Sequence, residues 1–230
     1  VAVDYPQSVT QISFYASDTP PPFIIPVTET PNIIIPITET PIFIEPLPVT
    51  DTPAFIPAAK WWEVYFTDPL IINNPDVIAG SIEEKLIELI NNAQTSIHIA
   101  SFEFNLTPVA EALIVAKSRG VDVKWITDDE NGLEYDVQPG RGQFTLMAAA
   151  GIELKDDAGR SALMHNKFWI FDQQIVWTGS TNITVNGIFK QNNNVLVMRS
   201  PEMAYIYERE FQEMWNGQFG PRAPSTINNQ

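Results

Sequence analysis

The chain lacks cysteine altogether, which excludes disulfide bonds and thiolate metal sites. It has no apolar run near the roughly 18 residues that a membrane-spanning helix requires, so the sequence predicts no such helix. Basic residues are scarce, with 13 Lys and Arg against 28 Asp and Glu, and the formal net charge is -15. A chain of this charge repels DNA or an anionic bilayer at long range. The composition therefore argues against a broad nucleic-acid surface.

Residues 1–59 lack lysine, arginine and glycine, yet they hold 12 of the 19 prolines. An Asp-Thr-Pro or Glu-Thr-Pro unit recurs there, beginning at Asp18, Glu29, Glu39 and Asp51. Proline removes backbone donors and disfavours helix in the residue before it, so we expect extended segments. We interpret residues 1–59 as a proline-rich arm or stalk. Its apolar clusters leave a second interpretation open, in which the arm lies against the domain or a partner.

Strand and helix patterns alternate through residues 60–220, which we interpret as one domain followed by a short tail at 221–230. Apolar residues at helical spacing, or in strict alternation, distinguish the two kinds of element. The expected strands are 61–67, 95–104, 121–127, 152–154, 166–172, 174–180 and 193–200, and the expected helices are 81–93, 107–120, 144–150 and a last one opened by Ser200 and Pro201. This order predicts an α/β fold with a mixed β-sheet flanked by helices.

The stretch 163–182 gathers side chains suited to phosphate chemistry. Two of them lie two residues apart on one expected strand and therefore share a face, and the turn at 172–174 returns two more toward that face. These four residues are His165, Lys167, Ser180 and Asn182. A phosphodiester needs such a set, which supplies a nucleophile for phosphorus, a cation for the nonbridging oxygens and neutral donors. Gly179 would let the backbone approach closely.

The spacing of these residues matches the pattern HxK(x)4D(x)6GSxN at all six fixed positions, from His165 through Asp172 to Asn182. In this signature the chain resembles the phospholipase D superfamily. The resemblance implies a phosphodiester hydrolase that needs no metal and no other cofactor. It implies that His165 attacks phosphorus to form a phosphohistidine, that Lys167 binds the phosphoryl oxygens, and that Ser180 and Asn182 complete the phosphate pocket. Asp172 would be the motif's acid, and its place at the turn suggests a brace.

The chain departs from this family in two ways. The family's site uses two copies of the motif, whereas this chain holds one, because the other histidine, His98, is followed two residues later by Ala100. The resemblance therefore implies a homodimer with its active site at the twofold interface. About 13 residues after the serine, family members often carry a glutamate that orients the histidine, and here that position is Asn193. Its amide oxygen would accept the same hydrogen bond without a charge.

Two other features have plainer interpretations. The acidic stretch 128–136 fails the calcium-loop pattern at Thr127 and Gln138, so we expect a solvated loop at the rim of the site. His98 is expected to be a structural residue. Several aromatics could form an apolar wall, although core packing is their expected use, and these are Trp61, Trp62, Phe102, Phe104 and Trp169.

Three functions fit the sequence, in descending order. The first is hydrolysis of a phospholipid or small diester, the second is an endonuclease of the same superfamily, and the third is an inactive binding module. The acidic composition favours a single diester over long nucleic acid. The absence of cysteine fits a reducing cytoplasm and an exported bacterial protein equally. Because the chain begins at Val1 rather than at methionine, we expect a bacterial protein that is exported or associated with the cell envelope.

Overall fold

The computed structural model describes residues 60–157 and 159–220, so the arm expected at 1–59 and the tail at 221–230 lie outside the described residues. The elements in chain order are β1 Trp62–Phe66, α1 Ile82–Asn92, β2 Ser96–Ser101, α2 Thr107–Ser118, β3 Asp122–Ile126, the π-helix η1 Asp129–Leu133, the 3-10 helix η2 Glu134–Val137, α3 Gln143–Ala149, β4 Glu153–Lys155, β5 Lys167–Phe171, β6 Ile175–Gly179, α4 Val185–Phe189, β7 Asn194–Arg199 and α5 Pro201–Trp215. None of the described helices is long and apolar enough to cross a membrane.

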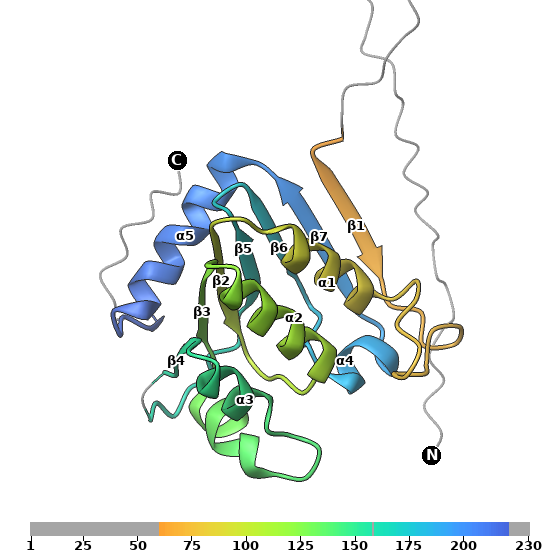
Figure 1. The fold of residues 1–230 in the computed structure, drawn as a ribbon, viewed down its shortest axis with the longest axis horizontal. Coiled ribbons are helices and arrows are strands. Elements are labelled where there is room, and N and C mark those ends of the chain that lie inside the picture. The colour runs from red at the N-terminus through yellow and green to blue at the C-terminus, as the bar shows by residue number, and fades with distance from the viewer. Residues whose placement is uncertain (1–59, 158, 221–230) are drawn as a thin grey trace, which may run out of the picture. The chain divides into compact units, whose positions relative to one another are not determined.

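The strands form one seven-stranded sheet in the order β1-β7-β6-β5-β2-β3-β4. The pairs β2–β3 and β3–β4 are parallel, and the other four pairs are antiparallel, so the predicted mixed sheet is confirmed. With these directions, β1, β6, β2 and β3 end at the same edge of the sheet where β5 and β7 begin (Figure 1). The loops at that edge are therefore neighbours in space although they are distant in sequence.

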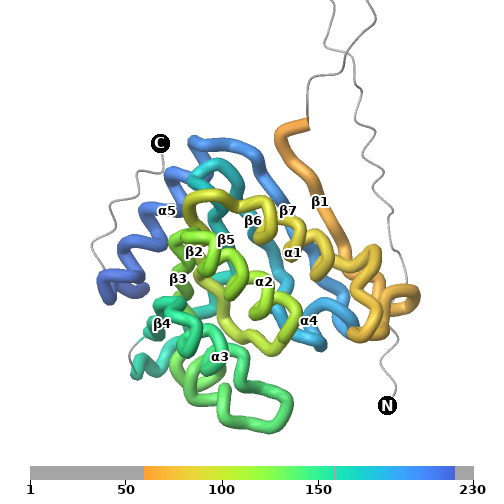
Figure 2. The backbone as a smooth tube through the Cα atoms, in the orientation of Figure 1, coloured from red at the N-terminus to blue at the C-terminus, as the bar shows by residue number. Residues whose placement is uncertain are grey.

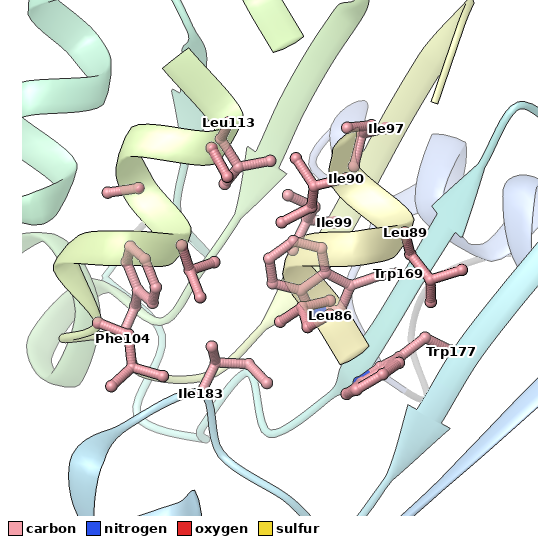
Figure 3. Packing of buried hydrophobic residues seen from close by; sticks show 14 of the residues in the cluster. Leu86, Leu89, Ile90, Ile97, Ile99, Phe104, Leu113, Trp169, Trp177 and Ile183 are labelled. Carbon is pink, nitrogen blue, oxygen red and sulfur yellow. The ribbon is translucent and has the colours of Figure 1, made fainter. Parts of the chain in front are cut away.

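Helices cover both faces of the sheet. Helices α1 and α2 lie together on one face, and α5 lies across the other (Figure 1). Alternate residues of β5 serve the two layers, since Trp169 and Phe171 join the core beneath α1 and α2, whereas Phe168 and Ile170 join the core beneath α5. Figure 3 shows the larger core, with Trp169 beside Leu86 and Ile99. Strand β5 is thus buried on both faces.

Serine side chains cap the first turns of α1 and α5. The Ser81 side chain accepts from the Glu84 N–H at the start of α1, and the Ser200 side chain accepts from the Met203 N–H at the start of α5. The expectations for these two helices are confirmed. Sequence periodicity missed α4, whose five residues are too few to show a helical period, and it missed the two short helices after β3.

The β5–β6 hairpin closes through a turn in which Asp172 and Gln173 have φ values of 52° and 54°. The Asp172 carboxylate reaches across to the start of β2, where it accepts from the N–H groups of Gln94, Thr95 and Ser96 and from the Thr95 hydroxyl. Burial works against ionisation of this carboxyl, but the backbone donors outweigh it and hold the pKa of Asp172 below its usual value. Asp172 therefore ties the hairpin to β2.

This tie predicts that Asp172→Asn lowers the free energy of unfolding by about 1–3 kcal/mol at pH 7, because Asn keeps the turn conformation but loses the charge. The carboxylate's contribution is present above a pH of about 4 and is lost as the pH falls through the lowered pKa of the folded chain. Urea denaturation at pH 7 and at pH 3 measures both effects, with Gln173→Asn as the matched turn variant. Equal stability of Asp172→Asn and wild type at pH 7 would contradict the tie.

Candidate active site

The motif residues lie at the edge of the sheet where β5 begins and β6 ends. Lys167 is the first residue of β5, and His165 lies two residues before it. The pairing of Phe168 with Thr178 continues to place Lys167 opposite Gly179, so the residues after β6 return to the same edge. The structure thus brings the histidine and lysine to the side of the sheet that carries Ser180 and Asn182.

Phe102 lies against both reactive side chains of this edge. Its ring packs edge-on to the His165 ring, with 4.8 Å between the ring centroids. The Lys167 Nζ lies 5.2 Å from the centroid of the same ring and donates a 3.0 Å hydrogen bond to the His165 carbonyl oxygen. Phe102 is buried, and His165 is exposed. The histidine therefore stands at the surface on an apolar support while the lysine folds beneath it.

Glu103 joins the two halves of the motif. Its carboxylate accepts a 2.8 Å hydrogen bond from the Asn182 amide Nδ2 and pairs with Arg141 at 3.4 Å. Its charge also acts on both His165 and Lys167. The sequence analysis did not identify Glu103. The signal that could have found it is a carboxylate placed directly after a buried strand, at the edge where the motif also lies.

The electrostatic surroundings favour a neutral imidazole. Burial lowers the pKa of His165, and the charge of Lys167 lowers it further, while Asp128 and Glu103 oppose the shift. Burial also lowers the pKa of Lys167, and Glu103 opposes that shift. An imidazole whose pKa lies below 6.5 is neutral at pH 7 and keeps a lone pair for attack on phosphorus.

Ser180 is held by the residues that follow α4. Its hydroxyl donates to the Asn193 amide oxygen at 3.0 Å and accepts from the Asn194 N–H at 3.1 Å. The Asn193 Nδ2 donates to the Gly187 carbonyl oxygen at 2.9 Å. The partners recorded for the Asn193 side chain are thus Ser180 and Gly187 rather than the histidine ring that the sequence analysis assigned to it.

Gly179 serves the contact between β6 and β7. A Cβ atom at this position would overlap the carbonyl oxygen of Asn194, so only glycine lets the two strands come this close. The same carbonyl accepts a 3.1 Å hydrogen bond from the Ser180 N–H. Close approach at Gly179 therefore sets the position of Ser180.

Asp172 lies away from these residues. It follows β5 at the opposite end from His165, and a five-residue strand at about 3.3 Å per residue spans roughly 17 Å. Its carboxylate is engaged by the start of β2, as described above. The structure does not bring Asp172 into contact with the histidine or the lysine.

The expectation of a solvated acidic loop at 128–136 is wrong for three of its carboxylates. Asp128, Asp129 and Asp136 are buried, because each accepts hydrogen bonds from nearby groups. Asp128 accepts from the Met164 N–H at 3.0 Å, one residue before His165. Asp136 accepts from the Phe144 and Thr145 N–H groups in the first turn of α3. The acids turn inward because they satisfy backbone donors that would otherwise be buried alone.

Within the described residues, Asp128, Asp129 and Asp157 form the one group of side chains that could hold a metal ion, with ligand atoms within 4.8 Å of one another. Asp157 already accepts from the Asp129 N–H and lies 3.6 Å from the Arg160 guanidinium. Burial raises the pKa of Asp157, and the neighbouring charges of Asp128 and Asp129 raise it further. Through these contacts, and through the bond from the Met164 N–H to Asp128, the cluster holds the segment before His165 in place.

The remaining sequence candidates are structural. His98 is buried, stacks on Phe211 with 4.7 Å between ring centroids, and bonds to Glu208 at 2.8 Å. The expectation that it is structural is confirmed. Phe104 and Trp169 are core residues, as their preferred interpretation predicted, whereas Trp61 and Trp62 are exposed. Of these five aromatics, Phe102 is the one with a ring contact to the motif.

The electrostatics predict a measurable titration. We expect the ring protons of His165 to titrate with a midpoint below 6.5, higher in Lys167→Met and lower in Glu103→Gln, because the lysine lowers and the glutamate raises this pKa. Proton NMR suits the measurement, since the chain has only two histidines and His98→Gln assigns the second signal. A midpoint at or above 6.5 that neither substitution moves would contradict the assignment.

Comparison with known proteins agrees with this geometry. The family model "Cardiolipin synthase, PLD-like domain" matches residues 86–215. The mitochondrial cardiolipin hydrolase of Xenopus tropicalis is 32% identical over 131 residues, which are 57% of this chain and 60% of that protein. The chain therefore spans less than two thirds of the length of this relative.

Two solved structures share the fold. Nuc from Salmonella typhimurium, a phospholipase D family member, superposes with a TM-score of 0.56 at 28% identity, over 68% of this chain and 95% of that one. NucT from Helicobacter pylori gives a TM-score of 0.52 at 20% identity, over 68% of this chain and 97% of that one. Since the family model covers more than half of the sequence and includes the whole motif, the chain belongs to the phospholipase D superfamily.

Proposed function

We propose that this chain is a metal-independent phosphodiester hydrolase that acts through a phosphohistidine on a phospholipid or small diester. The observation that carries the proposal is the pairing of a surface-exposed imidazole, whose pKa is lowered, with a half-buried lysine at one edge of the sheet. A neutral imidazole is the nucleophile that phosphorus requires, and the lysine offers a fixed positive charge to the phosphoryl oxygens.

In the first step, the lone pair of a His165 ring nitrogen attacks phosphorus, and the ester bond to the leaving alcohol breaks. The alcohol needs a proton as it departs. The chain holds one copy of the motif, so we assign this proton to His165 of a second copy, whose imidazole takes up a proton beside the anionic phosphodiester, with the site at a twofold axis. Lys167 and the Ser180 hydroxyl stabilise the charge on the phosphoryl oxygens.

In the second step, water attacks the phosphohistidine, and the bond between nitrogen and phosphorus breaks. The second histidine, which is neutral after the first step, takes the proton from the water. The products are a phosphomonoester and the two histidines in their starting protonation states. Asn182, which Glu103 orients, supplies a neutral donor beside the phosphate.

Most of the basic residues that could bind a phosphate chain are already engaged in other contacts, which supports a single-diester substrate. A nuclease track needs several cations free to meet successive phosphates. Lys124 pairs with Asp122 at 2.7 Å, Arg141 pairs with Glu103, and Lys155 donates to the Trp215 carbonyl oxygen. Lys190 is exposed, but one such residue does not form a track. The name of the relatives, cardiolipin hydrolase, also points to a lipid diester.

An endonuclease of the same superfamily is the second candidate, because the same motif chemistry serves any phosphodiester. Side-by-side assays of phosphatidylcholine micelles and single-stranded DNA at about 0.15 M salt separate the two. Faster DNA cleavage that His165→Ala abolishes would identify the nuclease and overturn the lipid assignment.

The covalent mechanism predicts that His165→Ala lowers diester turnover by about a thousandfold or more, while EDTA leaves the wild type unchanged. A primary alcohol should divert the phosphohistidine to a new diester, which mass spectrometry detects. His165 is exposed, so circular dichroism should show an unchanged fold. Strong EDTA inhibition would sink the metal-free mechanism, and hydrolysis without any transfer to alcohol would argue for direct attack by water.

The shared site predicts that activity requires two copies of the chain. A heterodimer of one wild-type and one His165→Ala chain, purified with two different tags, should be inactive because one site needs both histidines. Size-exclusion chromatography with light scattering supplies the oligomeric state. Full activity in a monomer peak, or half-activity in the heterodimer, would contradict the proposal.

A further inference from the structure

An exposed apolar turn follows β1 directly. Phe66, Leu70 and Ile71 are 73%, 91% and 78% exposed, although each is large and apolar. Three such residues within six positions are more than the scattered apolar exposure of an ordinary surface. A cluster of this kind marks a contact with an apolar partner.

The backbone N–H groups at the tip of this turn donate to Asp68 within the turn itself. The Ile71 and Ile72 N–H groups donate to the Asp68 carbonyl oxygen at 3.0 and 2.7 Å, and the Leu70 N–H donates to the Asp68 carboxylate at 3.3 Å. Residue 69 is proline and has no N–H to satisfy. Backbone donors that bond internally cost little when they leave water, so these N–H groups do not oppose contact with an apolar medium.

The turn is attached to the motif through Thr67. The Thr67 hydroxyl donates to the Gln191 carbonyl oxygen at 2.7 Å and accepts from the Asn193 N–H at 2.7 Å. Asn193 in turn accepts from the Ser180 hydroxyl. The apolar tip is therefore held at a fixed place relative to the phosphate-binding side chains.

A second exposed apolar tip lies on the other side of the motif. Val137, at the end of η2, is 84% exposed, and Tyr135 of the same helix is 47% exposed. The Arg141 guanidinium lies 4.9 Å from the Tyr135 ring centroid and pairs with Glu103. Figure 2 shows the turn after β1 and the segment before α3 apart from each other along the lower side of the view, with α4 between them. The two tips thus flank the candidate active site at the sheet edge where it lies.

We propose that this end of the molecule docks on a zwitterionic phospholipid surface, with Phe66, Leu70 and Ile71 inserted as the main anchor. The inference rests on the proposed lipid hydrolysis and adds how the enzyme reaches an aggregated substrate. Exposed apolar side chains at both tips suit an apolar layer, and the N–H groups that bond within the turn suit a partner without hydrogen-bonding groups. Asp68 and the net charge of -15 disfavour an anionic surface, so insertion rather than charge attraction carries the binding.

The test uses the full chain and sedimentation with phosphatidylcholine vesicles. Leu70→Asn/Ile71→Asn should weaken binding about tenfold or more, and Val137→Asn should weaken it in the same direction. The matched control is Val115→Asn, an apolar residue 51% exposed near the end of α2, which should bind like wild type. Wild-type binding should change little between 0.15 and 0.5 M salt, because apolar insertion is not screened. Loss of hydrolysis should be confined to vesicles, with a soluble aryl diester turned over normally.

Several results would overturn the docking surface. The first is a wild type that does not sediment with vesicles, and the second is a set of variants at both tips that bind like wild type. The third is a change of oligomeric state in the double variant, which would assign the turn to contact with a second copy. Val137→Asn lies in a separate segment, so it decides the question if the double variant fails to fold. Vesicle binding by a wild type that hydrolyses no diester would overturn the proposed function while leaving the docking surface intact.

Discussion

The position of β5 between β2 and β6 is the constraint on which the site depends. Ser101 pairs with Lys167 on one side, and the pairing of Phe168 with Thr178 places Gly179 opposite Lys167 on the other. Because side chains alternate along a strand, a slip of one residue would send Lys167 to the opposite face and would move Trp169 from the core beneath α1 and α2 to the one beneath α5. The buried tryptophan and the hairpin tie at Asp172 both oppose such a slip. Packing energy and turn geometry therefore fix the place of a lysine that itself contributes little to folding.

The partly buried charge of Lys167 is tolerated because an opposite charge lies near it. Lys167 loses water, and this loss alone would favour the neutral amine. Glu103 counters the loss and is itself held by the Asn182 amide and Arg141, so no single group carries an uncompensated charge. The lysine in turn lowers the pKa of His165. One carboxylate outside the motif thus opposes the lowering of the pKa of both Lys167 and His165, so substitution of Glu103 would change their titration without removing the nucleophile.

Sequence reasoning reached the fold class, the strand order along the chain and the two long capped helices, because each rests on periodicity or on a local end group such as Ser81. It also predicted that the hairpin brings the four motif residues together, and the structure places them at one edge of the sheet. It could not find Glu103 or Phe102, whose contact with the site depends on β2 lying beside β5. The prediction for the acidic segment was wrong because a run of carboxylates normally indicates a solvated loop. The backbone N–H groups that bond to Asp136 are known only from the structure. Pairing across strands and capping across loops are tertiary facts that no local pattern contains.

Many acids and bases of this domain already have partners, and this bears on the proposed substrate. Carboxylates near the site, Asp128 and Asp136, are buried and spent on backbone donors, so the formal charge overstates the negative surface at this edge. Bases near it are spent on carboxylates or carbonyl oxygens, so few remain for a phosphate chain. Among the groups that the edge exposes are the His165 imidazole and the apolar side chains of the two tips. A surface with single-phosphate chemistry between apolar contacts fits the proposed lipid substrate, a headgroup joined to its acyl chains, whereas a nucleic acid would need the reverse, many cations and few apolar contacts.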